Sequence, residues 1–311
     1  MGEAFSNLMK GIRDGRFVYT GELEPHKSTD LSAVLAWART LRETGRIVAA
    51  NVTDNPQSVG SMSSLAASYI VQRETGLETV YQLRASDRNR LALLSDLLGA
   101  AALGLRNVLA LTGDHTQKGD TVEAMPVFDL DGTQLVDLIH RMVYEGKDLS
   151  GNEIHGPPPQ LNIGAASNPN FEPLEIEVLK LERKAEVGAD FIQTQVIFDE
   201  EAALRYLDAV EHINIPILIG IFPPRSRGQA EYFDKYVPGV SVPKEFLERF
   251  GEFKKIADKK ERRGRINEYN IEFFSDFIKK VKKKRACKGI HLMAVGYPEV
   301  IGPIIEEVEG A

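Results

Sequence analysis

The sequence predicts a single (β/α)8 TIM barrel with a long helical insertion between its seventh and eighth strands. The chain has 311 residues, a length at which α/β barrels commonly form one domain. Short apolar runs alternate eight times with longer amphipathic runs, at a spacing of about forty residues. The first expected strand ends in Gly-Glu-Leu-Glu-Pro at 21–25, without the Gly-rich turn typical of an open doubly wound sheet, which is the alternative fold. We therefore expect residues 1–311 to form one catalytic barrel domain.

Eight short runs of apolar and β-branched residues, each bounded by turn residues, are the expected strands. They cover residues 17–23, 47–52, 79–83, 107–111, 161–165, 191–197, 215–221 and 290–295. Strands of a barrel are buried on both faces, because helices cover the outside and side chains fill the inside. That environment explains why these runs are apolar almost throughout.

Runs with apolar residues at i, i+3, i+4 and i+7 follow the strands and are expected to be helices. They cover residues 31–41, 61–75, 133–145, 174–187, 199–210 and 298–308, with one long helical stretch over 229–285. A further helix follows the third strand, and its expected barrel-facing stripe is Leu91, Leu94, Leu98 and Ala101. The Pro-rich segment 156–159 is expected to be a loop.

Composition excludes several classes of protein. Hydrophobic residues make up 43% and charged residues 27%, which is typical of a globular chain. The net charge of −7 argues against a nucleic-acid partner, and the one cysteine, Cys287, cannot form an internal disulfide. No run approaches the roughly 18 apolar residues of a membrane span, and residues 1–13 lack a secretory signal pattern. We expect a cytoplasmic protein with no membrane partner.

The loops that follow the strands of a barrel converge on one mouth, where barrel enzymes carry their chemistry. The expected strand ends supply mainly carboxylates and amides: Glu22, Glu24, Asn51, Asp54, Gln82, Asp114, Asn168, Gln193 and Gln195. His115 is the only histidine expected there, so we expect no metal site, and neither a GxSxG nor a GxxxxGK[ST] motif is present. The remaining chemistry is proton transfer by one or two carboxylates, with amides binding a heterocycle such as a pterin, a flavin or a nucleobase.

The individual residues differ in how strongly they indicate a site. Glu22 lies in an apolar strand, where a carboxylate costs stability unless it is paired, so a functional role is favoured over a buried ion pair. The pattern at Gly113 and Asp114 fits a site and a plain turn equally well. Gln195 by itself is typical of a polar layer inside the barrel, and His115 is expected to be a loop histidine.

Five motifs, in order on successive expected strands and helices, resemble the methylenetetrahydrofolate reductase family. They are Gly-Glu-Leu-Glu-Pro at 21–25, Leu-Ala-Leu-Thr-Gly-Asp at 109–114, Ile-Gly-Ala-Ala-Ser-Asn-Pro at 163–169, Leu-Glu-Arg-Lys-Ala-Glu-Val-Gly-Ala at 181–189 and Gln-Thr-Gln-Val-Ile-Phe-Asp at 193–199. The resemblance covers residues 17–306. It is closest to short bacterial members, which lack the regulatory domain of animal members and work with a partner subunit.

The resemblance implies a flavoprotein oxidoreductase that reduces 5,10-methylenetetrahydrofolate to 5-methyltetrahydrofolate, in one-carbon metabolism and methionine biosynthesis. It implies that Glu22 is the catalytic acid. Asp114 takes the place of an aspartate beside the flavin and is the second implied catalytic residue: it stays ionised, binds the pterin and stabilises developing positive charge. Gln195 takes the place of the pterin-binding glutamine. Lys184 and Glu177 stand where the family contacts the flavin phosphate and the ribityl chain. The implied cofactor is a flavin, with FAD favoured over FMN.

The sequence also departs from the family at positions that would contact the flavin. Asn51, Gln82 and Asn168 stand where a threonine, a histidine and a tyrosine are expected. Thr112 replaces the arginine that precedes Gly113 and Asp114, and Arg227 lies near the place of a nicotinamide-stacking phenylalanine. Apart from Arg227, the residues named in this paragraph are still expected to bind the cofactor. Gln82 is expected to bind the substrate as well. The electron donor stays open between a nicotinamide nucleotide and a redox partner subunit.

Two other functions stay open from the sequence: a flavin-free, pterin-binding methyltransferase barrel, and an electron-relay subunit of a larger reductase complex. We expect a homo-oligomer or a hetero-complex. A basic segment, residues 254–285, holds 13 Lys and Arg against 5 Asp and Glu. It is interpreted as a solvated helix face, or else as a surface that binds the polyglutamate tail of a folate or an acidic partner subunit.

Overall fold

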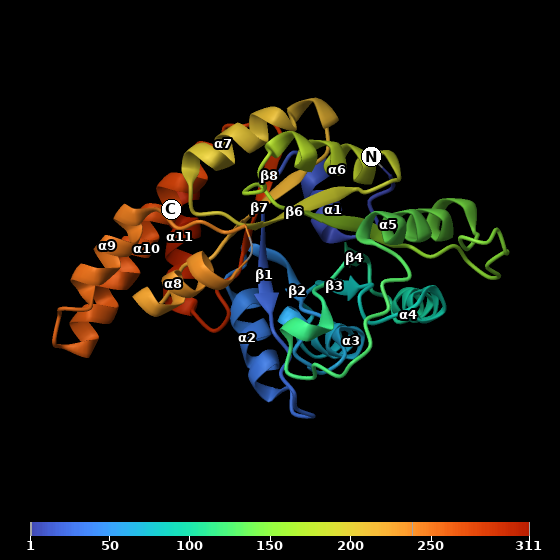
Figure 1. Ribbon diagram of the computed structural model, residues 1–311, viewed down its shortest axis with the longest axis horizontal. Helices are drawn as coiled ribbons and strands as arrows, with labels where there is room; N and C mark the ends of the chain where they lie inside the picture. The colour runs from blue at the N-terminus through green and yellow to red at the C-terminus, as the bar shows by residue number, and fades with distance from the viewer. Residues whose placement is uncertain (1, 238, 311) are drawn as a thin grey trace.

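The computed structural model describes residues 2–237 and 239–310, so both ends of the predicted 1–311 domain lie outside the described residues. Eight parallel strands form a closed barrel in chain order, with helices around its outside (Figure 1). The strands are β1 (Val18–Leu23), β2 (Ile47–Val52), β3 (Thr79–Arg84), β4 (Asn107–Leu111), β5 (Asn162–Ser167), β6 (Phe191–Val196), β7 (Ile217–Ile221) and β8 (Cys287–Leu292). The predicted (β/α)8 barrel is confirmed.

Strand β8 begins three residues earlier than the sequence indicated. Cys287 pairs with Ile217 of β7, and Gly289 pairs with Val18 of β1 to close the barrel. A Cβ at Gly289 would lie 2.3 Å from the carbonyl oxygen of Val18, so glycine allows the two backbones to approach. The Lys-Gly pair at 288–289 resembles a turn in the sequence, which explains the misplaced strand.

The outer helices largely follow the expected order, and several begin at side-chain caps. They are α2 (Ser32–Glu43), α3 (Ser64–Thr75), α4 (Arg90–Ala102), α5 (Gly132–His140), α6 (Leu174–Glu186), α7 (Glu200–Ala209) and α11 (Pro298–Glu309). Asp131 and Gln134 form a capping box at the start of α5, and Asp199 accepts a hydrogen bond from the backbone at the start of α7. In the part of the chain that the structure describes, no helix is long and apolar enough to cross a membrane.

The stripe predicted for α4 was partly wrong: Leu94 and Ala101 pack against the core, but Leu91 and Leu98 do not. Leu91 is 71% exposed and Leu98 is 38% exposed, whereas Leu93, Leu97 and Ala100 are fully buried. Helix α4 carries leucine or alanine at nearly every position, so more than one stripe fits a period of 3.6 residues. Periodicity alone could not select the face that packs on the barrel.

The insertion between β7 and β8 is confirmed and consists of three helices, α8 (Arg227–Tyr236), α9 (Lys244–Phe253) and α10 (Lys259–Val281). Helices α9 and α10 project to one side of the barrel (Figure 1). They are held together by aromatic contacts: the rings of Phe246 and Phe273 lie 4.8 Å apart, and those of Phe250 and Tyr269 lie 6.0 Å apart.

A short N-terminal helix that the sequence analysis did not expect, α1 (Asn7–Arg13), packs on the barrel's N-terminal end. Its buried side chains form one cluster with the lowest layer of inward-facing side chains: Leu8, Met9, Ile12, Val18, Ala49, Val80, Leu109, Phe191 and Leu218. This end of the barrel is therefore apolar and closed. The inward-facing polar side chains Thr20, Asn51, Gln193 and His291 lie above this apolar layer, toward the C-terminal ends of the strands.

Candidate functional site

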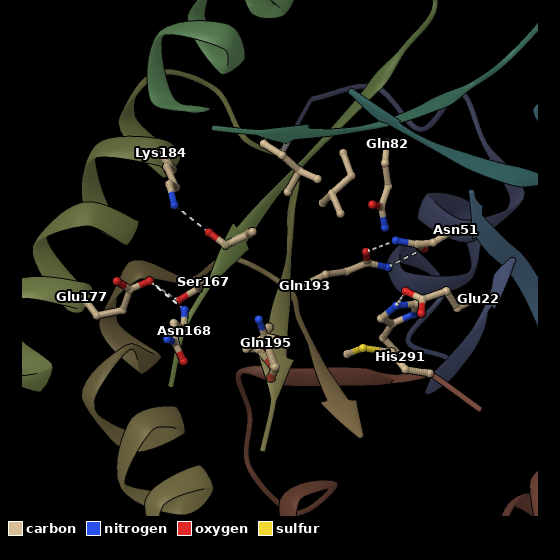
Figure 2. Close-up of a pocket in the computed structure, with 15 residues that line it drawn as sticks. Glu22, Asn51, Gln82, Ser167, Asn168, Glu177, Lys184, Gln193, Gln195 and His291 are labelled. Carbon is tan, nitrogen blue, oxygen red and sulfur yellow. Dashed lines mark hydrogen bonds and ion pairs between the residues drawn. The ribbon is translucent and has the colours of Figure 1, made fainter. Parts of the chain in front are cut away.

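A cavity of about 380 Å³ lies at the C-terminal end of the barrel interior (Figure 2). It is lined by Glu22, Asn51, Gln82, Leu109, Leu111, Ala166, Ser167, Asn168, Glu177, Lys184, Gln193, Thr194, Gln195, His291 and Met293. Seven of the predicted site residues meet here: Glu22, Asn51, Gln82, Asn168, Glu177, Lys184 and Gln195. The side chains come from β1 to β6, β8 and α6, as the convergence of strand ends in a barrel requires.

Glu22, near the end of β1, faces a histidine across the barrel closure. Its Oε2 lies 3.4 Å from Nε2 of His291, and Nδ1 of His291 lies 3.0 Å from the hydroxyl of Thr20. Among the described residues, only His291 has a basic side chain within ion-pair distance of the Glu22 carboxylate. Thr20 and His291 are almost completely buried, so this carboxylate is held at the floor of the cavity by groups that do not move freely.

Two amides continue this polar layer to the other side of the barrel. Nδ2 of Asn51 donates to Oε1 of Gln193 at 2.5 Å, and Nε2 of Gln193 donates to Oδ1 of Asn51 at 3.1 Å. The same Nε2 lies 3.5 Å from the hydroxyl of Thr20. A connected network therefore runs from Glu22 through His291, Thr20 and Gln193 to Asn51.

Glu177, at the start of α6, is used by the protein itself. Its Oε1 accepts hydrogen bonds from the hydroxyl of Ser167 at 2.9 Å and from the backbone N–H of Asn168 at 2.8 Å. The hydroxyl of the buried Tyr206 donates to Ser167, and Lys180 lies 3.6 Å from the other oxygen of Glu177. This carboxylate therefore ties the end of β5 to α6 through Oε1, while Oε2 keeps Lys180 as its ion-pair partner.

Lys184 reaches the cavity from the second half of α6. Its Nζ donates to the carbonyl oxygen of Ala166 at 2.6 Å. Burial lowers the pKa of this ammonium group, while the nearby Glu177 opposes the shift. Lys184 thus supplies a partly desolvated cation with further N–H donors available to a ligand.

Three amides have hydrogen-bonding capacity left over. No partner lies within hydrogen-bond distance of the Gln82 side chain in the residues the structure describes. Gln195 uses only its Oε1, which accepts from the N–H of Val196 at 2.9 Å. Asn168 uses its Oδ1 for Asn170, and its amide lies against the backbone of Gly239. These unpaired donors and acceptors suit the polar edge of a heterocycle.

The loop after β4 lies outside this cavity. The hydroxyl of Thr112 accepts from the N–H of Gly132 at 2.9 Å, and Gly113 has a φ of +87°, where a Cβ would lie 2.4 Å from the hydroxyl of Ser86. The carboxylate of Asp114 lies 3.1 Å from Nζ of Lys118 and is 41% exposed. Their proposed roles in catalysis and cofactor binding stay predictions, because the structure does not bring these three residues to Glu22.

His291 and Thr20 were missed as site residues, and Gln193 was expected at the mouth but was given no role. The prediction of the eighth strand at 290–295 put His291 near the start of that strand and left His115 as the only histidine expected at the mouth. That expectation is wrong, because β8 ends at Leu292 and His291 lines the cavity. His115 lies in the loop after β4, where its ring stacks on Phe128. Alternation was the available signal: Gly289, His291 and Met293 are spaced by two, as are Gln193 and Gln195, so each set faces the interior.

The residues of the cavity fit a ring system better than a metal. Within the described part of the chain, no group of three or more His, Cys, Asp and Glu side chains could hold a metal ion. The volume is near the lower end of the roughly 300–1,000 Å³ typical of small-molecule sites, so it suits ring heads. The polar edge of a flavin or a pterin fits the unpaired amides of Gln82 and Gln195.

The fold and the cavity together define a (β/α)8 barrel with an amide-lined cavity at its C-terminal mouth and a carboxyl group on the first strand. The family model for methylenetetrahydrofolate reductase matches residues 7–309, and the chain belongs to this family.

Two named relatives support this membership, one aligned over nearly the whole chain and one over just over half of it. Methylenetetrahydrofolate reductase 1 of Schizosaccharomyces pombe is 23% identical over 305 residues, which cover 94% of this chain and 46% of the relative. The 5,10-methylenetetrahydrofolate reductase of Buchnera aphidicola subsp. Schizaphis graminum is 28% identical over 190 residues, covering 58% of this chain and 56% of the relative. The chain thus spans about half the length of these curated relatives.

A solved structure from Clostridium thermocellum supports the fold. It aligns with a TM-score of 0.61 at 14% sequence identity and covers 97% of this chain and 98% of its own. That protein is described as binding two copies of 5-methyl-5,6,7,8-tetrahydrofolic acid.

Proposed function

We propose that this protein reduces 5,10-methylenetetrahydrofolate to 5-methyltetrahydrofolate with a bound flavin. The carrying observation is the pair of the half-buried Glu22 and the buried His291 at the floor of an amide-lined cavity, in a chain of the methylenetetrahydrofolate reductase family. The names of the relatives support the reaction, and the folate bound by the Clostridium thermocellum protein supports a pterin ligand.

Glu22 is the proposed general acid. When the five-membered ring of the substrate opens, the bond between the methylene carbon and N10 breaks, and its electron pair goes to N10. Glu22 donates a proton to that nitrogen, which leaves a methylene iminium at N5 of the pterin. The flavin, when bound, supplies the hydride that reduces this carbon to the methyl group.

His291 is a positioning residue in this proposal. A neutral imidazole with its proton on Nε2 donates toward Glu22, and its Nδ1 then accepts from the hydroxyl of Thr20. Gln193, held by Asn51, donates to the oxygen of Thr20 and orients that hydroxyl. The network therefore fixes the direction in which Glu22 presents its oxygens to the cavity.

The remaining residues bind the ligands. Gln195, with Gln82, is proposed to pair with the polar edge of the pterin. The flavin is proposed to be held inside the cavity by Asn51, Gln82, Asn168, Glu177 and Lys184. The parts of the flavin at the rim are proposed to contact Thr112, Gly113 and Asp114. FAD is the proposed form. The electron donor is proposed to be a nicotinamide nucleotide or a redox partner subunit, and residues 1–311 a single cytoplasmic catalytic unit in a homo-oligomer or a hetero-complex.

Purified full-length protein tests this proposal against its alternatives. We expect an absorption spectrum with flavin bands, and turnover of 5,10-methylenetetrahydrofolate with NADH, NADPH or a chemically reduced viologen dye. A folded protein that binds folate without flavin and transfers its methyl group would favour the methyltransferase alternative. Flavin-loaded protein that reduces no folate with any of these donors would overturn the proposal and favour the electron-relay role.

A further inference from the structure

Two adjoining cavities, of about 660 and 350 Å³, lie beyond the C-terminal ends of β7 and β8. Both are lined by Arg225, Arg262 and Ile266, so they form one continuous depression. We call it the basic groove, because six basic residues line it: Arg225, Arg227, Lys254, Lys259, Arg262 and Arg263.

Most of the positive charge in the basic groove is uncompensated. Arg227 pairs with Glu231 at 2.9 Å, and Arg263 pairs with Glu299. Across residues 2–237 and 239–310, no carboxylate lies within ion-pair distance of the other four cations, Arg225, Lys254, Lys259 and Arg262. Like charges gathered in a concave surface repel one another and attract anions.

The other end of the basic segment 254–285 behaves differently, and this corrects the interpretation of the segment as one binding surface. Five of the basic residues between 279 and 285 form ion pairs with acidic residues of α7, α11 and the short helix η4 (Glu211–Ile213). The pairs are Lys279 with Glu307, Lys280 with Glu200, Lys282 with Glu309, Lys284 with Asp208 and Arg285 with Glu211. Apart from the exposed Lys283, this end is a compensated helix face, so the unpaired charge gathers at the groove end.

The floor of the basic groove is held in place by the barrel. Arg225 donates to the carbonyl oxygen of Val295, and its guanidinium carbon lies 5.0 Å from the ring centre of Tyr297. Nδ2 of the buried Asn270 donates to the carbonyl oxygen of Pro224 at 2.8 Å, which ties α10 to the loop after β7. A guanidinium fixed this way presents its remaining donors to a carboxylate or phosphate at little cost in entropy.

The basic groove also lies close to the catalytic cavity. Met293 lines the cavity and Gly296 lines the groove, so the chain between them spans at most about 11 Å. A folate carries its glutamyl carboxylates at the end opposite its pterin, and a nucleotide carries phosphates beside its ring. Either ligand, with its ring in the cavity, would have an anionic end to place near Arg225.

We propose that the basic groove binds the anionic end of a ligand whose ring occupies the catalytic cavity. The chemistry is shared by the carboxylates of a polyglutamyl folate tail and the phosphates of a nicotinamide nucleotide. The cations of the groove are several and come from separate elements, which suits a chain of anions. The identity of the ring in the cavity rests on the proposed function, whereas the anion site itself does not.

The test compares binding to full-length wild-type protein and a groove variant, Lys254→Gln/Lys259→Gln, whose side chains make no ion pair within the described ranges. The ligands are 5-methyltetrahydrofolate with one or with five glutamyl residues, NADH and NADPH, each at low and at physiological salt. The control variant, Lys10→Gln/Lys283→Gln, removes the same charge from exposed sites at the N-terminal end of the barrel.

We expect the groove variant to lose roughly three- to tenfold in affinity for the pentaglutamyl folate, mostly at low salt, with the monoglutamyl folate and the control variant unaffected. A loss confined to NADH or NADPH would also support the groove and would identify phosphate as its anion. If every affinity changes no more than in the control variant, the proposal is wrong. If the wild-type protein binds neither folate, the proposed function fails instead, and the nucleotide measurements alone decide the groove.

Discussion

The two opposite walls of the catalytic cavity are built in different ways. The Glu22 wall, which holds Glu22 and His291, consists of inward-facing strand residues that contact one another (Figure 2). The contacts join the neighbouring strands β1 and β8 and, at Asn51 and Gln193, cross the barrel. The Lys184 wall, which holds Lys184 and Glu177, comes from α6, and its charged groups bind backbone groups at the end of β5.

This difference separates residues proposed to act in the reaction from residues that mainly stabilise the protein. On the Glu22 wall, the ionisable groups face each other and the cavity, so their protons are available to a ligand. On the Lys184 wall, one oxygen of Glu177 and one donor of Lys184 already stabilise the protein. We therefore expect substitutions on the Glu22 wall to act on catalysis, and those on the Lys184 wall to act on ligand binding and stability.

The largest effect is expected at the proposed acid. Glu22→Gln keeps the shape of the side chain and removes its transferable proton, so kcat for methylenetetrahydrofolate reduction should fall about 10²–10⁴-fold. Flavin content and thermal unfolding should stay as in the wild type. Glu43→Gln is the matched control, because Glu43 lies exposed at the end of α2, at the opposite end of the barrel from the cavity. Turnover by Glu22→Gln within a few-fold of wild type would remove Glu22 from the mechanism.

A smaller effect is expected when the positioning residue is changed. His291→Asn removes the Nε2 that faces Glu22 and should lower kcat about tenfold while changing the shape of its pH profile. His115→Asn, in the loop after β4, should leave both unchanged. A purely structural His291 would lower the yield of folded protein, but the pH profile of the remaining activity would match the wild type.

Loss of the hydrogen-bonded amide pair Asn51–Gln193 should lower the stability of the fold. Asn51→Leu leaves a buried amide of Gln193 without its partner, which should lower the free energy of unfolding by about 1–3 kcal/mol. The double variant Asn51→Leu/Gln193→Leu removes both partners and should recover part of that loss. Denaturant unfolding measures both. Additive losses in the double variant would show that the two amides do not act as a pair.

The smallest effect is expected at the rim. Asp114 is paired with Lys118 and lies outside the cavity, so Asp114→Asn should lower turnover by less than about tenfold. Lys118→Gln is the companion variant, and it should have a similar or smaller effect. A loss at Asp114 as large as that at Glu22 would mean that this loop supplies a group to the reaction and that the two-wall account is incomplete.

Much of the fold could be predicted because strand alternation and helix periodicity are local. Glu22 was found for the same reason, since a carboxylate in an apolar strand is visible in a short window. The partners of Glu22 were not, because the contacts are between distant residues: His291 meets Thr20 and Glu22 only when β8 closes on β1. A three-residue error in placing β8 was enough to hide the histidine.

Other parts of the site depend on hydrogen bonds and ion pairs between residues far apart in the sequence. Asn51 was expected to contact a cofactor, yet its amide is bound by Gln193, which lies 142 positions away. The basic segment looked uniform in the sequence, but Lys282 and Lys284 have acidic neighbours from other helices, while Lys254 and Lys259 have none among the described residues. Such pairing is invisible to composition and spacing.

The central claim is that Glu22 supplies the proton for reduction of a folate bound in this cavity. The most direct measurement is anaerobic stopped-flow mixing of the flavin-reduced protein with 5,10-methylenetetrahydrofolate, following the return of flavin absorbance. We predict rapid flavin reoxidation with formation of 5-methyltetrahydrofolate in the wild type, and a rate at least about 10²-fold lower in Glu22→Gln. Reoxidation at the same rate in both proteins, or none in the wild type, would contradict the account.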